Sequence, residues 1–259
     1  MPRSVSSIGS LPRKKWLNIV FDLNGILCQC IDRSQIPKSA RVNHVGMHLF
    51  SSSHPTVVGP KAVYTRPRLA EFLAMVAEVA DHVFVWSSMR RSTVELIAGF
   101  LFYGAKQPYE IMGQDFCTKV EISEGQHLKD LSGTKEIFFK DLSKRVFSIS
   151  NGAVIDKDNT LLIDDSPEKS VCNEAGNAIF LESWSRSKTR DDFLMGCLAP
   201  WLRQMHSSCA PGRLRAYVED NRIGRGPLEP SDPLYAHIRR GLNQSLAFSG
   251  QFYDFPGIR

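Results

Sequence analysis

Ile19-Val20-Phe21-Asp22-Leu23-Asn24-Gly25 is a short apolar run that stops abruptly at an aspartate and continues to a glycine. A run of large apolar residues of this length is typical of a strand buried on both faces, and the polar residues behind it indicate a tight turn. We therefore predict a buried strand here, with Asp22 and Asn24 directly after its carboxyl end.

Further short apolar runs follow along the chain, separated by stretches with helical periodicity. After Pro67, apolar residues recur on one helical stripe as far as Val79, and Ser92 with Glu95 forms a capping-box signature that predicts a helix reaching about Phe102. Short strands that alternate with helices predict an α/β fold built on a parallel sheet. The other predicted strands are His82–Trp86, Glu136–Phe139, Thr160–Ile163 and Ala178–Leu181.

The remaining segments suggest how the chain is divided. We expect a flexible basic arm over residues 1–15, a main domain over residues 16–206 and a C-terminal appendage over residues 207–259, where glycine, proline and arginine become frequent. Within the main domain, residues 28–62 are polar and lack a clear period, so we expect an irregular insertion or flap there. We also predict a helix over Asp191–Met205 that bends at Pro200, and two short helices at Leu214–Asp220 and Leu234–Leu242.

Composition excludes several classes of protein. The chain has 259 residues, of which 42% are hydrophobic, so it can fill a core and is not disordered throughout. It contains no apolar run of about 18 residues, so we expect no transmembrane segment, and its basic first residues lack the apolar core of a secretory signal. A net charge of +5 suits phosphate-bearing partners, but no long basic block indicates direct nucleic-acid binding.

Polar side chains gather at the predicted strand ends. In an open parallel sheet, ligands bind beyond the carboxyl ends of the strands. Carboxylates from two strands can hold Mg²⁺, a lysine and a hydroxyl can contact phosphoryl oxygens, and one aspartate can attack phosphorus. Each residue alone is more often a turn, cap or surface residue, but together and in this order they indicate a phosphate-handling site. The set is Asp22, Asn24, Ser87, Lys140, Asp164 and Asp165.

These motifs, in this order, resemble those of the haloacid dehalogenase superfamily. The most specific motifs are Phe139-Lys140-Asp141-Leu142-Ser143 and Leu162-Ile163-Asp164-Asp165-Ser166-Pro167. They are similar to motifs of one branch of the superfamily, the RNA polymerase II C-terminal-domain (CTD) phosphatases and nuclear-LIM-interactor-interacting-factor-like proteins. The resemblance extends from about Asn18 to Trp201. It implies a Rossmann-like parallel sheet with helices on both faces, in a haloacid dehalogenase-like core with small insertions.

The resemblance also implies roles for the site residues. Asp22 corresponds to the nucleophile, Ser87 and Lys140 to the phosphate-contacting hydroxyl and amine, and Asp22, Asp164 and Asp165 to ligands of Mg²⁺. The backbone carbonyl of residue 24 would be a further metal ligand. The sequence departs from the family at this position, because the second aspartate, the general acid, is replaced by Asn24. Loss of a general acid typically costs about 10²–10⁴-fold in rate.

We therefore expect a Mg²⁺-dependent phosphatase that acts on phosphoserine or phosphothreonine in protein tails through an aspartyl-phosphate, slowed by Asn24. The alternative is a catalytically weakened, phosphatase-like protein-binding module, for example one related to the phosphatase-like subunit of the mitochondrial import translocase. A dehalogenase-type enzyme is a third hypothesis, which the motifs around Lys140 and Asp164 disfavour. The expected partner is a phosphorylated protein or peptide. The scattered cysteines favour an intracellular location, nuclear or cytoplasmic, with a mitochondrial one as the alternative.

Overall fold

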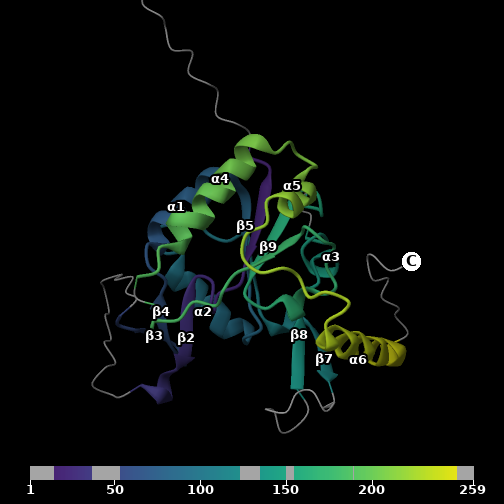
Figure 1. Cartoon of the computed structure of the whole chain (residues 1–259). Helices are drawn as coiled ribbons and strands as arrows, with labels where there is room; N and C mark the ends of the chain where they lie inside the picture. The colour runs from purple at the N-terminus through teal and green to yellow at the C-terminus, as the bar shows by residue number, and fades with distance from the viewer. Residues whose placement is uncertain (1–14, 37–52, 123–134, 150–154, 189, 250–259) are drawn as a thin grey trace, which may run out of the picture.

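The computed structural model describes residues 15–36, 53–122, 135–149, 155–188 and 190–249. Its centre is a five-stranded sheet in the order β10-β9-β1-β5-β6, in which every neighbouring pair is parallel (Figure 1). This confirms the predicted parallel α/β sheet. Every residue of β1 and β9 is buried, as their unbroken apolar runs predict. The strands are β1 (Leu17–Phe21), β5 (Ala80–Trp86), β6 (Glu110–Met112), β9 (Thr160–Asp164) and β10 (Ala178–Phe180).

Helices cover both faces of this sheet. On one face, Ile19 and Phe21 pack in the same cluster as buried residues of α1 (Leu69–Val79), α2 (Arg91–Leu101) and α4 (Ala199–Ser208). On the other face, side chains that include those of Val20 and Leu162 pack with α3 (Leu142–Arg145). The alternation of β1 side chains between the two clusters follows from the two-residue period of a strand. The expected layered architecture is therefore confirmed.

The insertion after β1 is more regular than expected. Strands β2 (Cys28–Asp32), β3 (Thr56–Val58) and β4 (Lys61–Thr65) form an antiparallel sheet in the order β2-β4-β3. The prediction of irregular chain was wrong for these residues, because their structure comes from pairing between distant segments, which leaves little period in a polar sequence. Residues 37–52 lie outside the described part of the chain.

A second departure concerns the predicted strand at Glu136–Phe139. It is a strand, β8 (Lys135–Phe139), but it pairs antiparallel with β7 (Thr118–Ile122) and lies outside the central sheet. The residues that connect the two strands, 123–134, are not described. Lys140 therefore reaches the molecule's centre from a separate hairpin.

Two predicted helix features are corrected. The capping box at Ser92 was wrong: α2 begins at Arg91, no side chain caps it, and Glu95 instead pairs with the Arg91 guanidinium at 2.9 Å. The helix predicted over Asp191–Met205 is made of two parts. A π-helical turn over Leu194–Leu198 leads into α4, so that Pro200 lies in the first turn of α4, where a missing backbone N–H is tolerated.

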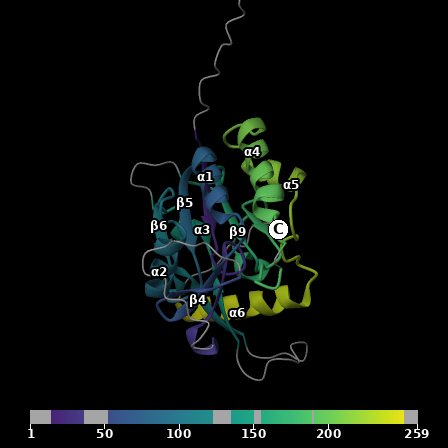
Figure 2. The ribbon, with the colours of Figure 1, turned by 90° about the vertical axis from the view of Figure 1, so that its left-hand side faces the viewer.

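The C-terminal residues pack onto the domain. Helix α5 (Leu214–Asp220) has the predicted bounds, and its Leu214 and Val218 join the main core cluster. Helix α6 (Pro233–Ser249) extends further than predicted, and Ile238 and Leu242 pack against apolar residues of the β7–β8 hairpin. Figure 2 shows α6 crossing the end of the molecule opposite α4. No helix in the described ranges is both long and apolar enough for a membrane span.

Candidate active site

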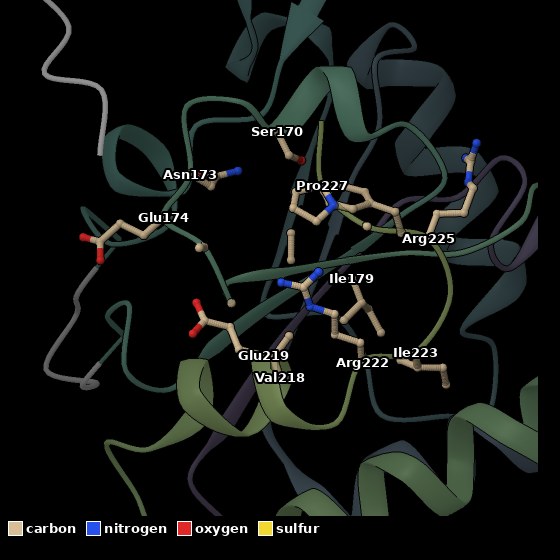
Figure 3. A pocket seen from close by; sticks show the side chains of 15 residues that line it. Ser170, Asn173, Glu174, Ile179, Val218, Glu219, Arg222, Ile223, Arg225 and Pro227 are labelled. Atoms are coloured by element: carbon tan, nitrogen blue, oxygen red, sulfur yellow. The ribbon is translucent and has the colours of Figure 1, made fainter. Parts of the chain in front are cut away.

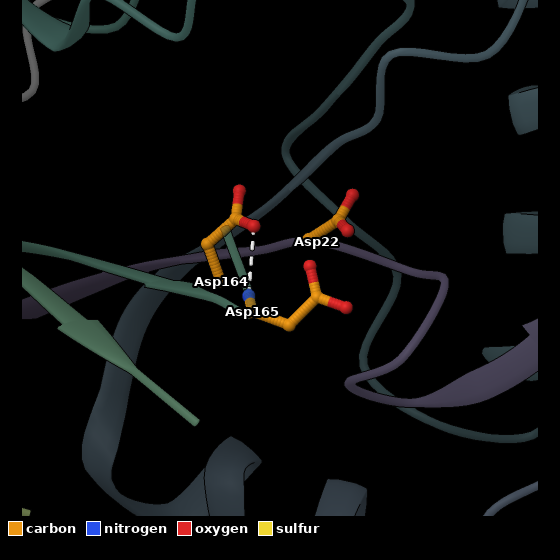
Figure 4. A group of neighbouring side chains, drawn as sticks. All are labelled: Asp22, Asp164 and Asp165. Atoms are coloured by element: carbon orange, nitrogen blue, oxygen red, sulfur yellow. Dashed lines mark hydrogen bonds between the residues drawn. The ribbon is translucent and has the colours of Figure 1, made fainter. Parts of the chain in front are cut away.

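Two neighbouring strands bring three carboxylates together. Asp22 follows β1 and is 3% exposed, and its backbone N–H donates to Ile163 O of β9 at 2.9 Å. Asp164 ends β9 and is fully buried, and Asp165 follows it. An oxygen from each of the three carboxylates lies within 4.8 Å of those of the other two. Figure 4 shows the three side chains turned toward one another. The structure thus places these predicted site residues in one cluster.

Lys140 enters this cluster from the end of β8. Its side chain is fully buried, and its Nζ lies 2.5 Å from Asp164 Oδ2 and 3.0 Å from Asp22 Oδ1. The backbone of Lys140 is held by two hydrogen bonds: its N–H donates to Lys169 O at 2.8 Å, and its carbonyl accepts from Asn173 Nδ2 at 2.8 Å. The ammonium group is therefore fixed between the two buried carboxylates.

Burial and charge shift the proton affinities of these groups in different directions. Burial raises the pKa of Asp22 to about 6, because it outweighs the opposing effect of Lys140, and the neighbouring Asp164 raises it further. Burial also acts to raise the pKa of Asp164, but Lys140, Lys169 and a hydrogen bond from the Ser166 backbone bring it below its usual value. The two carboxylates raise the pKa of Lys140 despite its burial. Lys140 is therefore a permanent cation at neutral pH.

The carboxylate cluster fits a hard divalent cation. Asp22 Oδ1 is buried and, beyond its ion pair with Lys140 Nζ at 3.0 Å, has no hydrogen-bond partner among the described residues. Asp164 Oδ1 accepts from the N–H groups of Asp165 and Ser166 at 2.7 and 2.9 Å, which fixes its orientation. Three carboxylates held within 4.8 Å of one another repel each other, and a cation with oxygen ligands would offset that repulsion.

The side chain of Asn24 contacts the small antiparallel sheet. Its side chain is exposed, and its Oδ1 accepts a hydrogen bond from the Cys30 backbone N–H of β2 at 2.8 Å. The amide therefore links the loop after β1 to the small antiparallel sheet. At this residue only the backbone carbonyl, which does not depend on side-chain type, remains as a proposed metal ligand.

Ser87 stands at the same end of the sheet as Asp22. It follows β5, which pairs with β1 in the register Phe21 to Val85, and it is 2% exposed. Its Oγ accepts from the Met89 backbone N–H at 3.4 Å, so the hydroxyl proton is left to donate elsewhere. This places the predicted phosphate-contacting hydroxyl at the end of β5, the strand next to that of the predicted nucleophile.

Arg66 is a structural element of the site that was not predicted. It is 4% exposed, pairs with Asp191 through two hydrogen bonds of 2.7 and 3.1 Å, and donates to Ile26 O at 3.1 Å. It thereby ties the loop after β1 to the start of the C-terminal helical region. The partner Asp191 lies 125 residues away along the chain, and nothing local in the sequence indicates the pairing.

Gly25 closes the loop against the acid cluster. Its φ of +86° lies in the left-handed region, and a Cβ at this position would overlap Asp165 Oδ2 and crowd Ser183 Oγ. Its carbonyl also accepts from Trp184 N at 2.8 Å. The glycine thus allows the loop backbone to approach the proposed metal ligand closely.

We expect Gly25→Ala to destabilise the protein by about 1–3 kcal/mol and to displace the Asp165 carboxylate, because the added Cβ meets both a strained φ and a packed side chain. Gly104→Ala is the matched control: Gly104 has a φ of +76°, but a Cβ there would have no neighbour within 4 Å. Chemical denaturation of both variants measures the difference. Equal losses of stability in the two variants would contradict a specific contact at Gly25.

The chain belongs to the family of NLI interacting factor-like phosphatases, whose family model matches residues 17–211. It is also similar to a solved structure of a variant of the fission yeast RNA polymerase II CTD phosphatase Fcp1 bound to beryllium fluoride. The identity is 15%, with 93% of this chain and 52% of that chain covered and a TM-score of 0.41.

A structure described as Fcp1, an essential RNA polymerase II CTD phosphatase, is similar at 14% identity and a TM-score of 0.40, with 90% of this chain and 61% of that chain covered. The chain thus spans between half and two thirds of the length of these two solved structures. No match was found among curated proteins.

Proposed function

We propose that the chain is a Mg²⁺-dependent phosphatase that removes phosphate from phosphoserine or phosphothreonine in protein tails, through an aspartyl-phosphate at Asp22. The observation that carries this proposal is the convergence of Asp22, Asp164 and Asp165 around the buried Lys140. Membership of a phosphatase family supports the reaction class.

In the proposed reaction, Asp22 attacks the phosphorus atom of the substrate. A carboxylate oxygen forms the new bond while the bond from phosphorus to the serine or threonine oxygen breaks, and that oxygen takes up a proton. Water then attacks phosphorus, inorganic phosphate leaves, and the Asp22 carboxylate is restored. Lys140 keeps Asp22 oriented and ionised for the attack, and Ser87 donates a hydrogen bond to a phosphoryl oxygen.

Bound Mg²⁺ would supply positive charge that draws electron density from the phosphoryl oxygens. Asp22, Asp164, Asp165 and the backbone carbonyl of Asn24 are the groups we propose to hold it. The carboxylates of Asp22 and Asp165 are the main candidates, since both oxygens of Asp164 already accept hydrogen bonds.

Asn24 supports a second candidate function. An amide cannot deliver and recover a proton as a carboxylic acid does, and its oxygen is already engaged by the Cys30 N–H. If water supplies that proton too slowly, the same pocket would bind a phosphorylated tail and release it with little turnover. The second candidate is therefore a phosphopeptide-binding module with weakened catalysis.

Steady-state hydrolysis separates the two functions. We expect Mg²⁺-dependent release of phosphate from an aryl phosphate, whose leaving group departs with little protonation, and slower release from a phosphoserine peptide, whose alkoxide needs a proton. Chelation of the metal should stop both reactions. Phosphopeptide binding without hydrolysis of either substrate would favour the binding module.

We expect millimolar Mg²⁺ to raise the melting temperature, because a ligand that binds only the folded state stabilises it by mass action, about 2.7 kcal/mol at one hundred times Kd. The gain should be smaller at pH 5.5 than at pH 7.5. The pKa of Asp22 is raised to about 6, so at the lower pH Mg²⁺ must displace a proton. Thermal denaturation with and without the metal measures this. A melting temperature unchanged by Mg²⁺ at both pH values would contradict the metal site.

A further inference from the structure

A cavity of about 530 Å³ is lined in part by Arg66, which donates to the carbonyl of Ile26 in the loop after β1. Its size is in the range of pockets that hold a ligand larger than a phosphate group. Part of its lining comes from Gly224 and Arg225, which follow the segment that matches the family, residues 17–211. Its charged and aromatic lining residues are Arg66, Glu182, Lys188, Asp191, Phe193 and Arg225.

Two of the three cations in this cavity are already neutralised. Arg66 pairs with Asp191 at 2.7 Å, and Lys188 pairs with Glu182 at 2.8 Å. Arg225 forms no ion pair with any residue in the described part of the chain. Among the described residues, Arg225 is therefore the cation of this cavity that no carboxylate contacts.

The backbone fixes Arg225 next to the acid cluster. Its N–H donates to Phe180 O at 2.6 Å, which pairs this segment with the edge of the central sheet. The preceding Gly224 has a φ of +76°, and a Cβ there would overlap the carbonyl oxygen of Phe180. The Arg225 guanidinium donates through Nη2 to the carbonyl oxygen of Asp165. One lining residue of the cavity thus contacts the backbone of a proposed metal ligand.

Arg222, three residues earlier, has a different surrounding. It lines a second cavity, between β10 and α5, which Arg225 also borders, but it does not line the 530 Å³ cavity. Figure 3 shows the guanidinium of Arg222 pointing into that second cavity, whereas the guanidinium of Arg225 points away from it. Two exposed arginines on one short segment therefore face different parts of the molecule, which makes Arg222 a matched control for Arg225.

We infer that Arg225 binds a second anionic group of the substrate, so that the site prefers phosphopeptides with a carboxylate or a further phosphate near the phosphorylated residue. This inference rests on the proposed function and names its substrate class. A guanidinium presents five donors, of which one is used on Asp165 O, so several remain for a carboxylate or phosphate. Because Arg66 and Lys188 are paired with carboxylates, Arg225 is the group in this cavity that selects for negative charge.

The test compares two phosphoserine peptides, one flanked by glutamates and one by glutamines. For the unaltered chain we expect kcat/KM to be about fivefold higher for the acidic peptide, as for a partly exposed charge pair. Arg225→Ala should remove this preference, Arg225→Lys should keep part of it, and Arg222→Ala should leave it unchanged.

Anisotropy titrations with non-hydrolysable phosphonate versions of both peptides give the same comparison without turnover. The unaltered chain could bind the acidic peptide more tightly through Arg225 and yet hydrolyse neither peptide. That result would overturn the phosphatase function and keep this inference. Three results would overturn the inference. The unaltered chain could show no preference for the acidic peptide, Arg225→Ala could lower kcat/KM equally for both peptides, or Arg222→Ala could remove the preference as Arg225→Ala does. An equal loss would show that Arg225 acts only by holding the Asp165 backbone.

Discussion

Asp22→Asn is expected to lower phosphate release by about 10⁴-fold or more, to the background of the assay, as loss of a covalent nucleophile does in other enzymes. An amide oxygen does not attack phosphorus, and the substitution also removes the charge that Lys140 faces at 3.0 Å. Hydrolysis of an aryl phosphate in saturating Mg²⁺ measures the loss. Beryllium fluoride, which stands in for the phosphoryl group, should stabilise the unaltered chain against heat and leave this variant unaffected.

Asp141→Asn is the control for this substitution. Asp141 is as buried as Asp22 and precedes α3, but its carboxylate accepts from Ser143 Oγ at 2.6 Å and from the Lys144 N–H at 3.2 Å, and it lies outside the acid cluster. An asparagine oxygen keeps these acceptor roles, so we expect less than about a tenfold loss. Full activity in Asp22→Asn would contradict the mechanism whatever the fold.

Asn24→Asp is expected to raise hydrolysis of a phosphoserine peptide by about 10²-fold, the usual contribution of a general acid. One carboxylate oxygen would keep the hydrogen bond from the Cys30 N–H, and the other would be free to carry a proton to the leaving oxygen. The gain should be smaller for an aryl phosphate. Rates on both substrates, measured side by side, show whether proton donation is the missing step.

Asn24→Ser controls for a loosened contact with Cys30, since a hydroxyl at this position is not an acid in the relevant pH range. It should bring no gain on either substrate. If Asn24→Asp folds and binds Mg²⁺ yet hydrolyses neither substrate, the site lacks more than one group. The binding-module function would then replace the phosphatase function.

The sequence predicted the parts of the fold that depend on local pattern. Strands β1 and β9 are unbroken apolar runs, so their burial and the acids at their ends could be predicted together. The β2-β4-β3 sheet could not, because its order depends on pairing between segments that have little period of their own. The start of α2 was misplaced because an Arg91–Glu95 pair replaced the expected cap.

In the site, too, the residues set by local pattern were predictable and those set by tertiary contacts were not. The acids and Lys140 were predicted by order along the chain, although Lys140 proved to come from a hairpin outside the sheet. The bond from Cys30 to Asn24 and the pairing of Arg66 with Asp191 depend on tertiary approach, which no local spacing encodes. Arg225 belongs to the C-terminal segment in which arginine is frequent, and its position beside Asp165 follows from the sheet edge on which it lies.

The hairpin that carries Lys140 has a consequence for how the protein folds. Pairing of β1 with β9 brings two carboxylates together, and burying them without a counter-charge is strongly unfavourable. Docking of the hairpin supplies that charge, and residues of α6 pack against the same hairpin. Helix α6 therefore stabilises the step that completes the site. Folding of the centre should be cooperative with docking of the C-terminal helix, and a chain still emerging from the ribosome would hold an incomplete site until α6 is released.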